Sequence, residues 1–150
     1  MLSVGRPDRA RFGPMFDEYV DRIRKFGVTF DARWVPEIRI AGRYTDEHVR
    51  EREAEALRRA LPERGNVVAL APQGEALSTE AFARRLERWS HPQAAFVVGG
   101  PLGLHDSFTR AAGTALSLSA MTLPHELARV VLAEQIFRAL SILRGVPYHK

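Results

Sequence analysis

Cysteine does not occur in this 150-residue sequence, and lysine occurs only as Lys25 and Lys150. The first absence excludes disulfides and thiolate metal sites. No apolar run approaches the roughly 20 residues that a membrane helix needs, and the first residues do not resemble a secretory signal peptide. We therefore expect a cytoplasmic protein with no membrane segment.

Several familiar catalytic and cofactor motifs are also missing. Gly99–Gly103 lacks the G-x-G-x-x-G spacing of a dinucleotide fingerprint, because Pro101 stands where a close-approach glycine is needed. There is no Walker loop, and neither Ser117 nor Ser119 lies in a nucleophile-elbow motif. The five histidines are His48, His91, His105, His125 and His149. Since no two of them stand at metal-ligand spacing, we expect no metal site.

Positive charge is plentiful and comes almost entirely from arginine, with a formal net charge of +4 and a pI near 10.1. Arginine suits bidentate phosphate recognition and stacking on bases. Some genomes encode arginine-rich proteins in general. The positive charge alone therefore does not decide whether this protein binds an anionic polymer. The length predicts one domain, residues 1–150, that buries about two thirds of its unfolded surface.

Hydrophobic periodicity predicts strands that alternate with helices. The predicted strands are Leu2–Val4, Val28–Val35, Val67–Leu70, the run ending at Val98, and Ala115–Ser119. The predicted helices run from Pro14 to Gly27, from Thr45 or Asp46 to Leu61, from Ser78 onward, from Asp106 to Gly113, and from Pro124 to Leu143. Alternation of this kind predicts an α/β fold, a mainly parallel sheet with helices on both faces.

Two details of this pattern lead to further expectations. Alternation in the second strand puts Val28, Phe30, Ala32 and Trp34 on one apolar face. The last helix is apolar on more than one side, which predicts burial on two sides. In a small domain the second cover is most simply another subunit.

Three turns stand at the carboxyl ends of predicted strands, after Leu70, Val98 and Ser119. Ligands of parallel sheets bind beyond these ends, and the turns are rich in small residues. We therefore expect a cleft for a small molecule with a flat polar ring. Asp106 is interpreted as a helix cap, and His125 as a capping or packing residue.

The last helix carries arginines at roughly turn multiples, which suggests RNA as a partner without deciding it. They are Arg129, Arg138 and Arg144.

Four ordered blocks in the last third carry a specific resemblance. They are Gly99–Gly103, Leu116–His125, Arg129-Val130 with Glu134-Gln135, and Pro147-Tyr148-His149. Together they resemble the ribosomal RNA large subunit methyltransferase H family (RlmH), a minimal member of the SPOUT class. The resemblance covers essentially the whole chain and is densest from Phe96 onward.

This resemblance implies a SPOUT-type trefoil knot in the C-terminal part, one of the rare exceptions to unknotted topology. It also implies an obligate homodimer that transfers a methyl group from S-adenosylmethionine to N3 of a pseudouridine in 23S rRNA on the ribosome. The cofactor contacts that it implies are Leu70, Gly99, Leu118, Ser119, Ala120, Met121, Thr122 and Leu123.

The resemblance also places the carboxyl-terminal tail near the substrate. We expect His149 or Tyr148 to take the N3 proton, in its own cleft or in the partner's, with Arg144 beside it. Arg129 and Arg138 are expected to bind the RNA. The sequence departs from the family in a shortened first strand, in Ala71 where an acidic residue is common, and in Glu75 where lysine is common. The last two put cofactor affinity in doubt.

Two other functions compete with this hypothesis. One is a ribosome- or RNA-binding module of the same fold that no longer transfers methyl groups. The other is a nucleotide-binding oxidoreductase, which the glycine spacing disfavours.

Overall fold

The computed structural model describes residues 1–8, 10–39 and 44–148 of the chain. Within these ranges the strands are β1 (Leu2–Val4), β2 (Arg33–Val35), β3 (Asn66–Ala76), β4 (Ala94–Val98) and β5 (Thr114–Ser117). They form one sheet in the order β2-β1-β4-β3-β5, and every pair of neighbouring strands is parallel. The predicted parallel sheet is confirmed.

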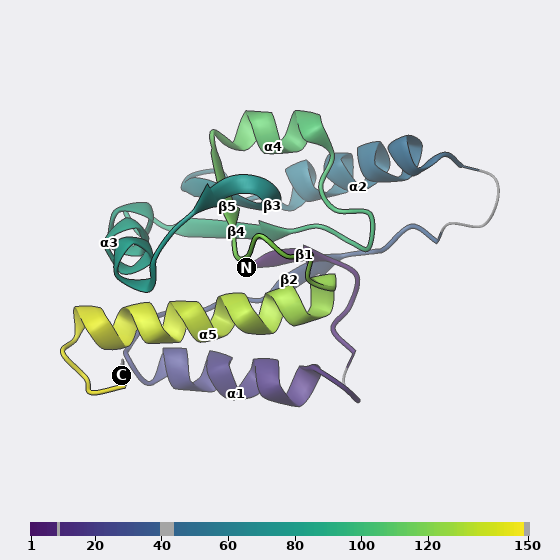
Figure 1. Ribbon diagram of the computed structural model, residues 1–150. Coiled ribbons are helices and arrows are strands. Elements are labelled where there is room, and N and C mark those ends of the chain that lie inside the picture. Colours follow the sequence, from purple (N-terminus) through teal and green to yellow (C-terminus); the bar gives the residue numbers. More distant parts are fainter. Residues whose placement is uncertain (9, 40–43, 149–150) are drawn as a thin grey trace.

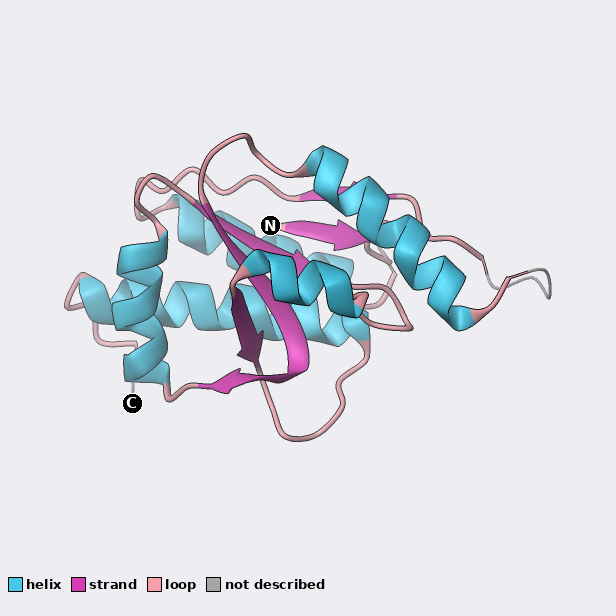
Figure 2. Cartoon of the chain, turned by 90° about the horizontal axis from the view of Figure 1, so that it is seen from above, coloured by secondary structure: helices cyan, strands magenta, loops and turns pink. Residues whose placement is uncertain are grey.

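Helices cover both faces of this sheet, as predicted. They are α1 (Gly13–Arg24), α2 (Asp46–Ala60), α3 (Thr79–Trp89), α4 (Asp106–Ala112) and α5 (His125–Leu143). Figure 1 shows α1 and α5 side by side below the sheet and α2 and α4 above it. Seen from above, α4 and α2 lie over the sheet while α3 stands at one end, where it packs on α5 (Figure 2). The trefoil knot stays a prediction.

Helix starts follow the capping residues in the sequence. The Thr45 hydroxyl accepts a hydrogen bond from the His48 amide at 3.2 Å, and the Ser78 hydroxyl accepts one from the Ala81 amide at 3.2 Å. At α4 the interpretation of Asp106 as the cap is wrong. The cap is His105, the residue before it, whose Nδ1 accepts from the Ser107 amide at 3.1 Å.

The second strand is shorter than predicted. Because Leu2 pairs with Arg33, the residues before Arg33 have no β1 residue opposite them. Val28 lies in a loop, where its side chain packs against the core beneath the sheet. Trp34, on the apolar face of this segment, is 47% exposed, whereas Val35 is 6% exposed. Trp34 therefore lies on the open side of an edge strand.

The predicted turn after Leu70 is a bulge inside β3. Leu70 and Glu75 both lie opposite Leu116 of β5, so the intervening residues loop out of the ladder. A Cβ atom on Gly74 would lie 2.6 Å from the Leu116 carbonyl carbon. Glycine at this position lets the two backbones approach.

Helix α5 is buried on two sides by its own chain. Leu132 and Ile136 pack with residues of the sheet and of α3, whereas Val130 and Ala133 pack with Phe16 and other residues of α1. The expectation that another subunit supplies the second cover is therefore wrong for these residues, because α1 supplies it. No helix in the described part of the chain is long and apolar enough to cross a membrane.

Candidate functional site

A cleft of about 770 Å³ opens beside the bulge of β3 and the carboxyl ends of β4 and β5. Parallel strands bring the turns that follow them to one edge of the sheet, as the sequence predicted. Seven of the eight expected cofactor residues line this cleft: Leu70, Gly99, Leu118, Ser119, Met121, Thr122 and Leu123. Ala120 is exposed and does not line it.

The turn after β4 folds the backbone tightly on itself. The Gly103 amide donates to the Gly100 carbonyl at 2.9 Å, and Gly103 has a φ of 77°. A Cβ atom on Gly99 would lie 2.5 Å from the Gly103 carbonyl carbon and 2.7 Å from the Leu104 nitrogen. Only glycine fits at position 99, so bare backbone forms this wall of the cleft.

The loop after β5 is held by its own serines. The Ser117 hydroxyl donates to the Ser119 carbonyl at 3.0 Å, and the Ser119 hydroxyl accepts from the Met121 amide at 2.9 Å. These bonds fix an irregular loop at the mouth of the cleft. The Met121 side chain is 78% exposed at this loop.

Charged and titratable side chains that the sequence reading had not assigned to the site also line the cleft. They are Arg50 from α2, Asp106 from α4 and His125 from α5. The Arg50 guanidinium is also hydrogen-bonded to Glu47. Burial, and then the charge of Arg129, lower the pKa of His125 below 6.5, so its imidazole is neutral at pH 7. The sequence gives no local signal for Arg50, because α2 has the charge pattern of a solvated helix.

A buried carboxylate lies behind the glycine turn. Glu53 of α2 is 3% exposed, and its Oε1 accepts from the Ile38 amide at 3.0 Å. Its Oε2 has no hydrogen-bond partner among the described residues. A Cβ atom on Gly100 would lie 3.2 Å from that oxygen. Burial raises the pKa of Glu53, because a carboxylate loses hydration there.

Arg129 is buried in the structure, although we expected it to bind RNA. Its side chain is 2% exposed, and its guanidinium donates to the Val4 carbonyl at the end of β1. Its Nε and Nη1 have no hydrogen-bond partner among the described residues. As placed, Arg129 joins α5 to β1 and presents no atom to an RNA at the surface.

The described tail residues lie away from the cleft of their own chain. Tyr148 packs on Phe137 with ring centroids 4.6 Å apart, and its hydroxyl is 3.5 Å from Glu134 Oε1. Phe137 lies about 18 Å along the α5 axis from His125, at roughly 1.5 Å per residue. Arg138 stacks on the Tyr148 ring at 4.8 Å and donates from Nε to Glu134 Oε1 at 2.9 Å.

Two other residues were predicted to act from the tail, and the structure describes only one of them. Arg144 is exposed at the end of α5. His149 lies outside the described residues.

Among the described residues, no group of three His, Cys, Asp or Glu side chains could hold a metal ion.

Comparison with known proteins gives a consistent result over the whole chain. Residues 1–149 match the family described as "Predicted SPOUT methyltransferase". A protein of Anaeromyxobacter sp. (strain Fw109-5) is 42% identical over 100% of this chain and 97% of its own length. One of Synechococcus sp. (strain CC9605) is 47% identical over 100% and 94%. One of Bacteroides fragilis is 32% identical over 99% and 96%. All three are named ribosomal RNA large subunit methyltransferase H.

Proposed function

Since this chain belongs to the SPOUT methyltransferase family, we propose that it methylates N3 of a pseudouridine in 23S rRNA, the one numbered 1915, with S-adenosylmethionine as donor. The observation that carries the proposal is the shared cleft. Seven residues that the RlmH resemblance assigns to the cofactor come from three separate turns and line one hollow of about 770 Å³. A volume of this size suits a cofactor-sized ligand.

The residues present fit S-adenosylmethionine. When bound, it supplies a methyl group already activated on a sulfonium. Leu70, Leu118 and Leu123 give the cleft apolar surface, and the Gly99–Gly103 backbone offers peptide groups at close range. These side chains and peptides would hold the donor in line with the acceptor nitrogen, which is the main contribution of the protein to such a transfer.

The acceptor nitrogen belongs to an imide, and its proton must leave. We assign the removal of this proton to Tyr148 or His149 of the tail. Arg144 beside them would offset the negative charge that develops on the base. In its own chain Tyr148 packs against the middle of α5, among Glu134, Phe137 and Arg138. The tail would therefore serve the cleft of a second copy, and we propose that the active protein is a homodimer.

RNA contacts are assigned to exposed cations near the tail. Arg144 is exposed, and Arg138 keeps 24% of its side chain exposed although it pairs with Glu134. Both can reach phosphate. We give Arg129 an indirect part, because its buried guanidinium fixes the Val4 carbonyl and with it the end of β1.

The decisive test supplies purified protein with labelled S-adenosylmethionine and ribosomes from cells that lack this modification. We expect one methyl group per large subunit, located by mass spectrometry on N3 of the pseudouridine. A Gly99→Ala variant, in which the added Cβ atom clashes with the backbone of the glycine turn, is the matched negative control. Methylation of another nucleotide would refute the assigned target. Binding of RNA with no calorimetric heat from S-adenosylmethionine would instead favour a binding module without transfer.

A further inference from the structure

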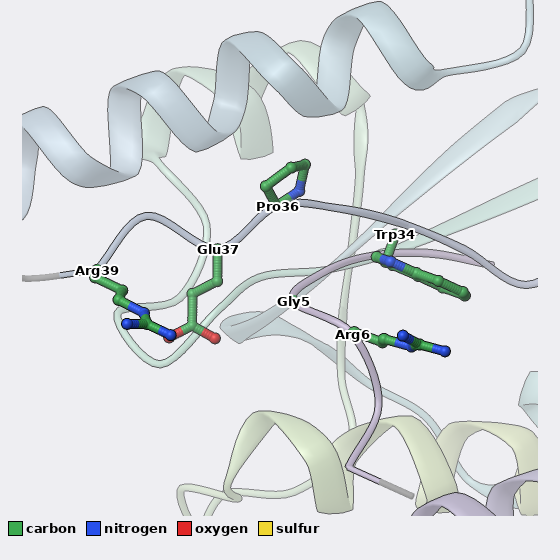
Figure 3. Close-up of a pocket in the computed structure, with 6 residues that line it drawn as sticks. All are labelled: Gly5, Arg6, Trp34, Pro36, Glu37 and Arg39. Carbon is green, nitrogen blue, oxygen red and sulfur yellow. The ribbon is translucent and has the colours of Figure 1, made fainter.

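A second hollow lies beside the cofactor cleft and has no part in the function proposed above. It measures about 630 Å³ and is lined by Gly5, Arg6, Trp34, Pro36, Glu37 and Arg39. Figure 3 shows Trp34 on β2 and the other residues on the segments that follow β1 and β2. The hollow therefore stands at the same edge of the sheet as the cofactor cleft, which lies at the bulge of β3 and at the ends of β4 and β5.

The strand order makes the two hollows neighbours. β1 pairs directly with β4, and neighbouring strands are about 5 Å apart. Val4 of β1 meets the cleft wall, because a Cβ atom on Gly100 would lie 3.0 Å from its side chain. Gly5, the next residue, already lines the second hollow. The two hollows therefore lie next to each other along this edge of the sheet.

The side chains of the second hollow suit a nucleotide. Trp34 is 47% exposed, and the Arg6 guanidinium lies 5.7 Å from the centre of its ring. In Figure 3 the guanidinium and the ring lie face to face. Unpaired RNA bases stack on aromatic rings and on arginine planes. Trp34 and Arg6 thus form a stacking surface that is open to solvent.

Charge in the hollow is also of the kind that an RNA strand needs. Arg6 and Arg39 are both exposed and can contact phosphate. The Glu37 carboxylate points toward Gly5, since a Cβ atom there would lie 2.9 Å from Glu37 Oε2. A carboxylate oxygen can accept from a base N–H or from the ribose 2′-hydroxyl. Stacking surface, cations and acceptor are all within one site.

We propose that this hollow binds the nucleotide next to the target in the RNA strand, with its base stacked on Trp34 and its phosphate on Arg6. The inference rests on the proposed function for the identity of the RNA. It adds a substrate site on the amino-terminal half of the chain, away from the tail. It also explains why a large aromatic residue stays exposed on an edge strand.

Direct binding can be followed through the two tryptophans, because Trp89 is buried at 7% exposure and serves as an internal reference. The probe is a short single-stranded oligouridylate. We expect salt-dependent quenching of the red-shifted emission of Trp34, with the blue emission of Trp89 unchanged. A Trp34→Phe variant should lose the quenched component. Equal quenching in wild type and Trp34→Phe, or none in either, overturns the assignment.

Kinetics on ribosomes test the same site. Loss of one stacked base should raise the KM for ribosomes about fivefold or more in Trp34→Ala, with kcat and S-adenosylmethionine affinity unchanged. Trp34→Phe should restore the KM, because phenylalanine can stack. Arg6→Gln should raise the KM and weaken its salt dependence. The control is Arg33→Gln, which removes the same charge from the opposite face of β2, where Arg33 pairs with Asp31 at 3.0 Å.

The outcomes separate this inference from the proposed function. If wild type methylates ribosomes and Trp34→Ala behaves like Arg33→Gln, the nucleotide site is refuted while the function stands. If wild type does not methylate ribosomes but oligouridylate quenches Trp34, the function fails and the RNA site stands. A blue shift of Trp34 emission with rising protein concentration and no RNA would show that a second copy covers the hollow, which also overturns the proposal.

Discussion

Replacing Gly99 by alanine should damage the cleft that we assign to S-adenosylmethionine, in a way that the geometry predicts. The new Cβ atom would lie 2.5 Å from the Gly103 carbonyl carbon and 2.7 Å from the Leu104 nitrogen. Carbon atoms in contact normally stand about 3.5–4.0 Å apart, so the turn must open by about 1 Å. Both obstructing atoms belong to the backbone, so no side-chain rotation relieves the clash.

The expected losses of folding stability and of cofactor affinity follow from this displacement. Overpacking of a well-packed site costs about 1–3 kcal/mol of folding stability. A shift of about 1 Å in a positioning element can cost about 100-fold in rate. We expect Gly99→Ala to bind S-adenosylmethionine about 10- to 100-fold more weakly by calorimetry, and to unfold at lower urea concentration.

A matched substitution separates local obstruction from general loss of stability. Gly27 has a φ of 74°, and no atom lies within 4 Å of a Cβ built on it. Gly27→Ala should cost about 1 kcal/mol through backbone strain alone and leave cofactor affinity unchanged. If Gly99→Ala binds the cofactor like wild type, or if Gly27→Ala loses affinity equally, the geometric reasoning about the turn is wrong.

Three further predictions concern Glu53, His125 and the carboxyl-terminal tail. Burial raises the pKa of Glu53 above 4.5, so the native state binds this proton more tightly than the unfolded state does. The free energy of unfolding of the wild type, measured in urea, should therefore fall as pH rises through that pKa. The Glu53→Gln variant should not show this fall. The pKa of His125 lies below 6.5, so its protonation in acid should weaken binding of the cationic cofactor, a pH dependence that His125→Asn should abolish in calorimetry. Tyr148→Phe and Gly99→Ala should each be poorly active alone, whereas a 1:1 mixture of refolded subunits should regain about a quarter of wild-type methylation, because half of the dimers carry one intact composite site. No recovery on mixing would refute a tail that acts in the partner's cleft.

Local patterns in the sequence were sufficient for the order of the strands and helices and for the edge of the sheet at which the cleft opens. Thr45 and Ser78 are capping residues whose hydrogen bonds are made to nearby backbone amides. Gly99 and Ser119 follow strands, and in a parallel sheet the carboxyl ends of strands share one edge. Interactions over a few residues, together with one rule of sheet topology, therefore predicted these features.

Contacts between distant segments decided the rest. Arg129 is buried because the carbonyl it binds belongs to Val4, at the other end of the chain. Trp34 is exposed because its strand lies at the edge of the sheet, an outcome that alternation along that strand cannot reveal. Arg50 lines the cleft because α2 crosses the face of the sheet beside the glycine turn. Periodicity along a sequence reports which side of an element is apolar, whereas the partner of that side depends on the packing of the whole chain.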